Sequence, residues 1–191
     1  MPPKFTKDQI VEAAFTIVRR EGWRALTTRS IAEALGSSAR PIYSFFNAMA
    51  EIEEQIVKLA VDLMHDYMTC KRTDDPWHDH GIGYVLFSMK EKPLFRSIND
   101  ESHISCFKKY GDLIWTSLTA ALSAYPPFQG LSKELIHQIQ LHRWLFAHGL
   151  AFSASNPPPD TWTEQNIIAM IQQGSDAIYK GLVHQYASTQ T

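Results

Sequence analysis

Apolar residues recur at spacings of three and four positions along almost the whole chain. No stretch long enough for a β-strand alternates apolar with polar residues. A spacing of three and four places apolar side chains on one face of an α-helix, whereas alternation would indicate a strand. Turn residues interrupt the helical pattern, most clearly at RTDDP (72–76), at Pro126–Pro127 and at NPPPD (156–160). The sequence therefore predicts an all-α protein of nine helices.

The segment Thr27–Phe46, TTRSIAEALGSSARPIYSFF, predicts two short helices joined by a tight turn. Gly36 lies where the first of them must end, because glycine adopts the left-handed conformation that closes a helix. Ser37 or Ser38 is a candidate cap for the next helix, and Pro41 suits its first turn. This layout is typical of a helix-turn-helix, whose second helix enters the DNA major groove. A generic helical hairpin is the alternative.

Capping signals and apolar faces place the other helices. Capping pairs are expected at Thr6 with Gln9 and at Thr161 with Glu164, and single caps at Thr27 and Ser132. The first helix ends at Gly22, and the later ones are expected over 49–71, 77–90, 93–100, 102–124, 132–154 and 161–186. We expect a DNA-binding domain over 1–48, a connecting helix over 49–72, and an effector-binding and dimerisation domain over 73–191.

Composition and charge narrow the class of protein. The chain has 191 residues, is 45% hydrophobic and 20% charged, and carries a net charge of −2. Residues 1–48 hold seven basic and four acidic side chains, so their net charge is +3, and the remainder carries −5. A basic N-terminal end suits a phosphate backbone. The two cysteines make no disulfide framework, and the lack of a signal peptide or membrane span predicts a cytoplasmic protein.

Several of these motifs together resemble the TetR family of bacterial transcriptional regulators. The match includes AAFxxVxxxG at Ala13–Gly22, TTRSIAEALG at Thr27–Gly36, and YxxF at Tyr43–Phe46. The segment Arg143–Ala154, RWLFAHGLAFSA, is similar to a Trp-His-Gly subgroup of the family's C-terminal domains. The resemblance implies a ligand-responsive repressor that binds a palindromic operator as a homodimer.

The resemblance and the chemistry together select the residues expected to bind double-stranded DNA. Thr27 and Tyr43 match positions that usually touch phosphates. Arg40 is suited to grip a guanine edge with two hydrogen bonds, although a phosphate contact is the open alternative. The full set of expected DNA-binding residues is Thr27, Arg29, Ser37, Ser38, Ala39, Arg40, Pro41, Tyr43 and Ser44.

One position departs from the family. Where many members have a lysine near the start of the fourth helix, this chain has Met49, and three glutamates follow at positions 51, 53 and 54. Weak or strongly salt-dependent DNA binding is therefore one expectation. Lys4 and Lys7 in the N-terminal arm are candidates to supply the missing positive charge.

The C-terminal half carries the expected dimer and effector residues. The resemblance implies a dimer interface on the last two helices, for which the sequence suggests Leu135, Ile139, Phe146, Ile167, Ile171 and Ile178. The alternative is that these residues form the subunit's own core. The effector is expected among Tyr84, Phe87, Phe95, His103, Phe107, Tyr110, Trp115, Trp144, His148 and Phe152. The same aromatic residues are otherwise plain core. Because no cluster of Arg or Lys marks an anion site, an uncharged or weakly polar hydrophobic effector is favoured.

The chain offers little support for catalysis or metal binding. His78, Asp79 and His80 lie close in sequence, but two histidines separated by one residue do not face one site on a helix. No nucleophile–base pair, paired carboxylate set or phosphate-binding glycine loop is present, so we expect no enzyme activity, no metal and no cofactor. A helical adaptor with a weakened DNA-binding head is the main alternative, and a helical-bundle enzyme is a lesser one.

Overall fold

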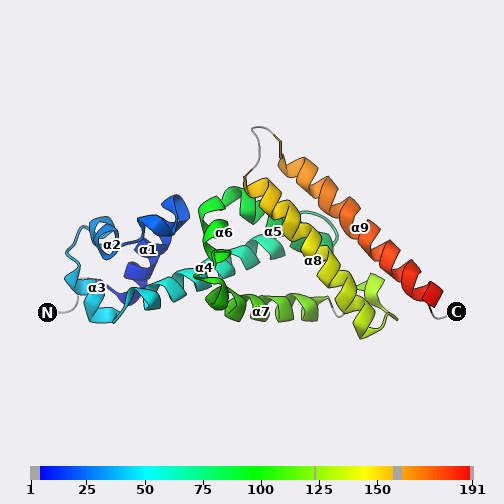
Figure 1. The fold of residues 1–191 in the computed structure, drawn as a ribbon, viewed down its shortest axis with the longest axis horizontal. Helices are drawn as coiled ribbons and strands as arrows, with labels where there is room; N and C mark the ends of the chain where they lie inside the picture. Colours follow the sequence, from blue (N-terminus) through cyan, green and yellow to red (C-terminus); the bar gives the residue numbers. More distant parts are fainter. Residues whose placement is uncertain (1–4, 123, 157–160, 190–191) are drawn as a thin grey trace. The chain divides into compact units, whose positions relative to one another are not determined.

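The computed structural model describes residues 5–122, 124–156 and 161–189. This described part is all-helical, as the periodicity predicted, and holds nine α-helices (Figure 1). They are α1 (Lys7–Glu21), α2 (Thr28–Ala34), α3 (Arg40–Phe45), α4 (Met49–Thr69), α5 (Pro76–Lys90), α6 (Lys92–Ile98), α7 (Ile104–Ala121), α8 (Lys133–Ser155) and α9 (Glu164–Thr189). Two short 3-10 helices, η1 (Trp23–Ala25) and η2 (Pro126–Phe128), follow α1 and α7.

Side-chain caps fix several helix starts. Thr6 Oγ1 accepts a hydrogen bond from the Gln9 N–H at 3.2 Å, and Gln9 Oε1 accepts one from the Thr6 N–H at 2.9 Å, which confirms the predicted capping box. Ser132 caps α8 as expected. The predicted pair at the start of α9 is wrong, because Thr163 exchanges these hydrogen bonds with Asn166. Both pairs have the spacing of three residues, so the sequence pattern does not choose between them.

The chain forms two compact units. The first holds residues up to Leu63 and Glu91–Asp112, and the second holds Met64–Lys90 and the residues from Leu113 onward. Helices α4 and α7 each contribute residues to both units. The division into 1–48, 49–72 and 73–191 groups residues by expected role and stays a prediction.

The first unit is built around the apolar face of α1. Ile10, Ala14 and Val18 are fully buried, as are apolar side chains of α2, α4 and α6. Helix α1 contacts both α2 and α6. Arg19 near the end of α1 donates to both carboxylate oxygens of Glu91, from Nε at 2.7 Å and from an Nη at 2.5 Å. This ion pair joins α1 to the N-cap residue of α6.

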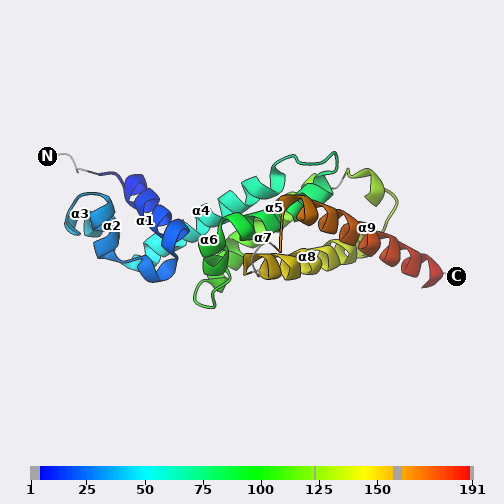
Figure 2. The ribbon, with the colours of Figure 1, turned by 90° about the horizontal axis from the view of Figure 1, so that it is seen from above.

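The second unit is built around α5. Helix α5 contacts α8 and α9, and these two helices run side by side in opposite directions (Figures 1 and 2). Eleven residues of α5 are buried, from Trp77 through Ser88, because packing covers more than one of its faces. Gly83 allows the close approach of α4: a Cβ placed there would lie 2.0 Å from the Tyr67 carbonyl oxygen.

An aromatic and aliphatic cluster closes one end of the second unit. Its buried members are Trp77, Leu122, Phe128, Leu135 and Ile139. The rings of Trp77 and Phe128 meet edge to face with centroids 5.6 Å apart, a favourable aromatic geometry. None of the described helices combines the length and the apolar character needed to cross a membrane.

Candidate functional site

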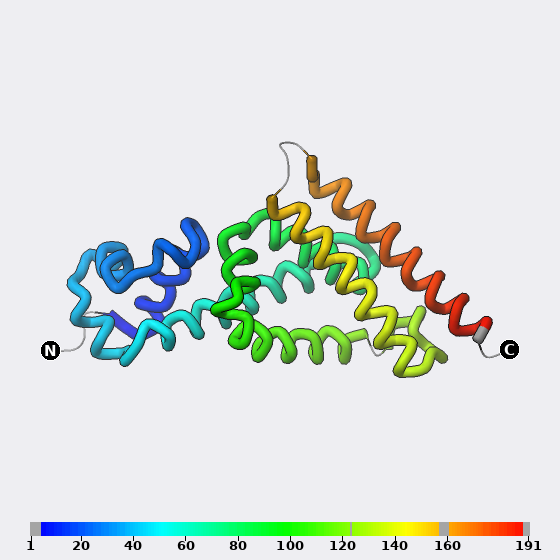
Figure 3. Tube along the Cα trace, in the orientation of Figure 1, coloured from blue at the N-terminus to red at the C-terminus, as the bar shows by residue number. Residues whose placement is uncertain are grey.

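The turn between α2 and α3 reverses the chain, as the Cα trace shows (Figure 3). Gly36 has φ +57°, and the N–H of Ser37 donates to the Ala32 carbonyl at 2.9 Å, which closes the end of α2. The predicted serine cap of α3 is wrong: Ala39 is the N-cap residue, and no side chain bonds there. Ser37 is instead used, through its backbone, to end α2. Pro41 lies in the first turn of α3, as expected.

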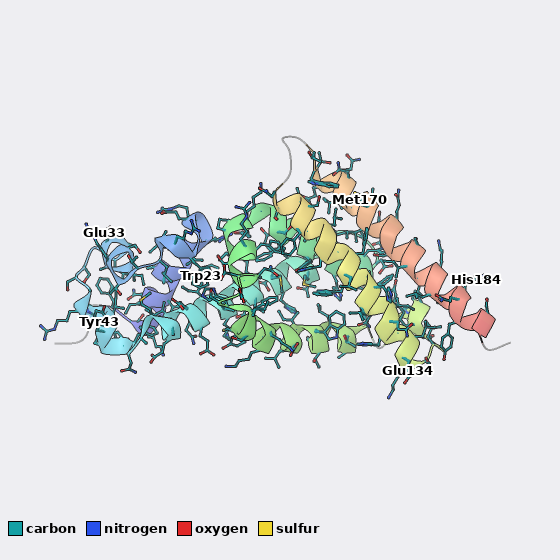
Figure 4. The ribbon with its side chains drawn as sticks, in the orientation of Figure 1. Trp23, Glu33, Tyr43, Glu134, Met170 and His184 are labelled. Atoms are coloured by element: carbon teal, nitrogen blue, oxygen red, sulfur yellow. The ribbon has the colours of Figure 1, made fainter. Side chains whose placement is uncertain are left out.

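Helix α3 has one buried face and one exposed face. Ile42 is buried, and Phe46, just after the helix, is buried as well. Tyr43 is 64% exposed, and its side chain is labelled in Figure 4. Arg40 and Ser44 are also exposed. A helix of six residues presenting Arg40, Tyr43 and Ser44 to solvent has the geometry of a surface that reads a groove.

The predicted DNA-contacting residues differ in how free their polar atoms are. Arg40 makes no hydrogen bond or ion pair with any residue that the structure describes, so its guanidinium is available to a ligand. Ser44 Oγ donates to the Pro41 carbonyl of its own helix at 2.6 Å. Thr27, Arg29 and Ser38 are exposed, whereas Ser37, Ala39 and Pro41 are half-buried. Thr27 is the N-cap residue of α2, and the other eight lie on α2, on α3 or in the turn between them.

Thr28 joins this set, although the sequence reasoning missed it. Tyr43 Oη donates to Thr28 Oγ1 at 3.4 Å, and Thr28 Oγ1 lies 3.5 Å from the sulfur of Met49, to which it donates. Thr27 Oγ1 accepts from the Ser30 N–H as the cap of α2. Thr28 thus connects α2, α3 and the first residue of α4. The repeated threonine in TTRS was the signal that two hydroxyls are available here.

Charges near this surface are partly neutralised. Arg29 donates to Glu33 at 2.8 Å, and this hydrogen bond raises the pKa of Arg29. Lys7 lies over the Phe46 ring, 5.0 Å from its centroid, while Lys4 lies outside the described residues. Glu54 on α4 accepts from Lys109 at 2.8 Å, which lowers the pKa of Glu54. The acidic start of α4 is therefore less negative than its sequence alone implies.

Four of the predicted effector residues gather in the second unit. Tyr84 Oη and His148 Nδ1 are 2.7 Å apart, and the His148 ring stacks on Trp144 with centroids 4.9 Å apart. Phe152 meets His148 edge to face at 4.9 Å. Burial lowers the pKa of His148 and raises that of Tyr84, so both are neutral at physiological pH. The four residues make an aromatic group with one hydrogen-bonded polar pair.

The other predicted effector residues lie elsewhere. Phe95, His103, Phe107 and Tyr110 belong to the first unit, where His103 stacks on Trp23 with centroids 4.2 Å apart. Tyr110 Oη donates to Glu54 at 3.0 Å. Phe87 is fully buried and meets Tyr67 edge to face. Trp115, on the part of α7 that belongs to the second unit, is half-buried. Their role in binding an effector stays a prediction.

The predicted dimer residues are mostly buried inside the subunit. Leu135, Ile139, Ile167 and Ile171 are at most 3% exposed, so little of their surface remains for a partner. Phe146 lies against Gly174 of α9, and Ile178 is half-buried. The exposed large apolar side chains of α8 are instead Leu141, Leu145 and Phe152. The alternative reading of a subunit core fits these four residues better.

His78, Asp79 and His80 have separate partners. His78 Nε2 lies 3.1 Å from Asp176 of α9. Asp79 accepts hydrogen bonds from the backbone of Arg72 and of Thr73 and from the Thr73 hydroxyl. His80 is buried, and burial together with the nearby Arg143 charge lowers its pKa to about 4. Within the described residues, no group of three or more His, Cys, Asp or Glu side chains is placed to hold a metal ion.

Comparisons with known proteins bear on the fold and on the class of protein. No family model matches the chain. One relative, an uncharacterized HTH-type transcriptional regulator of Mycobacterium tuberculosis, is 30% identical over 61 residues, which are 32% of this chain and 28% of the relative. The crystal structure of a protein assigned to the TetR family of transcriptional regulators, from Rhodococcus sp., superposes with a TM-score of 0.66 at 14% identity. That likeness covers 90% of this chain and 97% of the other, and it shows that the two share a fold.

Proposed function

We propose that this chain is a ligand-responsive DNA-binding transcriptional regulator of the TetR family, and that it acts as a repressor. The observation that carries the proposal is the exposed face of α3, where Arg40 and Tyr43 point to solvent while Ile42 is buried. A short helix held by its apolar side and exposed on its polar side is suited to the major groove. The shared fold and the helix-turn-helix relative support the same reading.

Arg40 is the residue assigned to base readout. Its fork of N–H donors matches the O6 and N7 acceptors of guanine, and no described residue competes for it. Tyr43, held by Thr28, is assigned to a phosphate, because its hydroxyl retains a lone pair and its ring is exposed. Thr27 and Ser38 are assigned to phosphates as well. The subgroup suggested by Arg143–Ala154 stays a proposal.

A homodimer follows from operator geometry. Two recognition helices read half-sites about one DNA turn apart only if the protein has two-fold symmetry. We assign the contact between subunits to the exposed side of α8, where Leu141, Leu145 and Phe152 leave large apolar side chains in solvent. This assignment replaces the buried residues that the sequence suggested. A small, largely hydrophobic effector is assigned to the second unit, which holds the aromatic group of Tyr84, Trp144 and His148.

The effector acts through its unequal affinity for two conformations. Helix α4 belongs to both units, so it is the continuous element that links effector binding to the DNA-binding end. A coupling free energy of about 1–3 kcal/mol lowers operator affinity by roughly 5- to 150-fold. The adaptor function remains the second candidate, because Met49 is half-buried against Thr28 and offers no charge to a phosphate.

The proposal is tested by selecting bound fragments from random double-stranded DNA with purified full-length protein. We expect a palindromic consensus with half-sites about one turn apart. Arg40→Ala should lower the affinity for the selected site and relax one base position, while Arg20→Ala, an exposed arginine of α1 bonded to Glu21, should change little. Met49→Lys should raise affinity and steepen the salt dependence by about one phosphate contact.

Enrichment no better than background at low salt, from protein shown to be folded and dimeric, would contradict DNA binding and favour the adaptor function. An unchanged consensus and unchanged affinity in Arg40→Ala would contradict the assignment of base readout to Arg40. Equal effects of Arg40→Ala and Arg20→Ala would show that only net charge matters.

A further inference from the structure

Arg143 of α8 is a buried cation without a counter-ion among the described residues. The residue is only 6% exposed, and its Nε has no hydrogen-bond partner in that part of the chain. In the parts of the chain that the structure describes, Arg143 makes no ion pair. Burial lowers its pKa to about 10, so it stays protonated at neutral pH. Removing a charge from water without pairing it is costly, and proteins normally pair such a group.

The carboxylates whose charges act on Arg143 or on its neighbour His80 are already engaged. Asp79 accepts hydrogen bonds from Arg72 and Thr73 in the loop before α5. Asp75, whose charge raises the pKa of Arg143, accepts from the Tyr125 hydroxyl at 2.6 Å and from the Trp77 N–H at 2.9 Å. What the protein does supply is the Trp77 ring, whose centroid lies 5.6 Å from the guanidinium carbon. A cation–π contact attracts the charge but leaves its N–H donors without acceptors.

Two more buried polar groups lack partners among the described residues, and they lie on the two helices that pack against α8. His80 Nδ1 of α5 and Ser175 Oγ of α9 make no hydrogen bond within the described part of the chain, and their residues are 5% and 0% exposed. The charge of Arg143 is among those that lower the pKa of His80. Gly81 marks where the three helices meet, because a Cβ placed on it would lie 2.9 Å from an Nη of Arg143 and 3.0 Å from Ile171, one helical turn before Ser175. Buried polar groups without partners are rare in native proteins, and three of them on these packed helices call for an acceptor.

We propose that Arg143, His80 and Ser175 bind the carboxylate group of the effector. A guanidinium, an imidazole N–H and a hydroxyl are all donors, and a carboxylate offers two oxygens with lone pairs for them. One buried cation balances a carboxylate, whereas a phosphate group carries nearly two charges. The inference rests on the proposed function, in which the second unit binds a largely hydrophobic effector. It replaces the expectation of an uncharged effector with a hydrophobic carboxylic acid.

The acceptor is a ligand rather than a carboxylate of a second copy of the chain. Successive residues of a helix are about 100° apart, so Leu145 points to the side of α8 roughly opposite Arg143. Leu141, Leu145 and Phe152 mark the exposed side of α8, and Arg143 lies on its buried side against α5 and α9. A subunit that packs on the exposed side does not reach the guanidinium.

The structure also offers a route from the surface. A half-open hollow of about 410 Å³ lies beside the loop between α4 and α5, and its lining includes Met68, Pro76 and His80. This volume is in the range of small-molecule sites. His80 belongs both to this lining and to the buried donor group. A ligand that enters through the hollow therefore meets His80 before it meets Arg143.

The test compares carboxylates with uncharged molecules of the same shape. Octanoate and 1-octanol, and benzoate and benzyl alcohol, are titrated into the full-length protein by calorimetry and by tryptophan fluorescence, to which Trp77 beside Arg143 contributes. The variants are Arg143→Met, Arg143→Lys and the control Lys133→Met, which removes an exposed cation from the same helix.

We expect at least one acid to bind the wild type about tenfold or more tightly than its alcohol. Arg143→Met should abolish this preference, Arg143→Lys should retain part of it, and Lys133→Met should retain all of it. Arg143→Met should also fold at least as stably as the wild type without ligand, because an unpaired buried charge is replaced by an apolar side chain. Folding failure therefore does not account for a lost preference.

The proposal is overturned if neither acid binds at millimolar concentration, if acids and alcohols bind alike, or if Arg143→Met keeps the preference for the acid. DNA selection on the same samples separates this failure from failure of the proposed function. A palindromic consensus without any acid preference would refute the carboxylate site alone. An acid preference that depends on Arg143, without any enriched DNA, would support the site and refute the regulator.

Discussion

Helices α4 and α5 approach each other closely at Gly83, and substituting this residue tests the packing directly. A Cβ at Gly83 of α5 would lie 2.0 Å from the Tyr67 carbonyl oxygen and 2.5 Å from the Met68 Cα, both in the backbone of α4. Backbone atoms cannot move aside as a flexible side chain does. In Gly83→Ala, α4 and α5 must therefore separate locally by about 1 Å or more.

The size of the effect follows from two opposing terms. Forcing a methyl group into a packed interior costs about 3 kcal/mol. Alanine favours the helix over glycine by about 1 kcal/mol, so we expect a net loss of about 2 kcal/mol. Gly181 of α9 is the matched control, because nothing lies within 4 Å of a Cβ placed there. Gly181→Ala keeps only the favourable helix-propensity contribution and should gain up to about 1 kcal/mol.

Urea unfolding followed by circular dichroism at 222 nm measures both variants. Their free energies of unfolding should differ by about 3 kcal/mol, which separates the midpoints by about 1.5 M if m is about 2 kcal/mol/M. Equal midpoints for the two variants, or a Gly83→Ala protein as stable as the wild type, would refute the described crossing of α4 and α5.

Two further predictions concern buried charge. Burial lowers the pKa of His80 in the folded state to about 4. Between pH 6.5 and pH 4 the unfolded chain therefore binds a proton at His80 that the folded chain does not. The free energy of unfolding should decrease as the pH is lowered through this range, by about 2 kcal/mol at pH 5. In urea titrations at several pH values, His80→Gln should make the free energy of unfolding less dependent on pH, whereas His184→Gln, at an exposed position, should not. An equal pH dependence in the two variants would contradict the assignment of this proton to His80. Arg19→Met should destabilise the protein by about 1–2 kcal/mol, because it removes the cation that pairs with the Glu91 carboxylate, whose side chain is 7% exposed, although Arg19 itself is half exposed. As the control, Lys58→Met removes one member of an exposed ion pair with Asp62 and should change stability by less than about 0.5 kcal/mol. A double-mutant cycle that shows no coupling energy between Arg19 and Glu91 would disprove the estimate for Arg19→Met.

Local signals in the sequence predicted much of the fold. The apolar spacing gave the number and approximate bounds of the helices, and the Thr6–Gln9, Thr27 and Ser132 caps lie where they were expected. Gly36 ends α2 with a positive φ, as a glycine at that position indicated. These features depend on residues three or four positions apart, so a short stretch of sequence contains all the interacting groups.

Where two local solutions were equally good, the sequence reasoning failed. Ser37 and Ser38 were both possible caps for α3, yet Ala39 occupies the cap position. Thr161–Glu164 and Thr163–Asn166 have the same spacing, and the second is used. Helical spacing likewise marks Leu135 and Ile139 as apolar, but it does not say whether the subunit's own core or a partner covers them.

The sequence by itself determined an all-helical chain with a helix-turn-helix near its N-terminus, because periodicity and turn chemistry are local. Only the tertiary structure packed the helices of Arg143, His80 and Ser175 together at Gly81, since these residues lie on three helices and are separated by up to 95 positions. In the sequence Arg143 is not part of a cluster of basic residues, so a search for such clusters does not single it out. Its significance is burial without a counter-ion, and burial is a property that long-range packing alone decides.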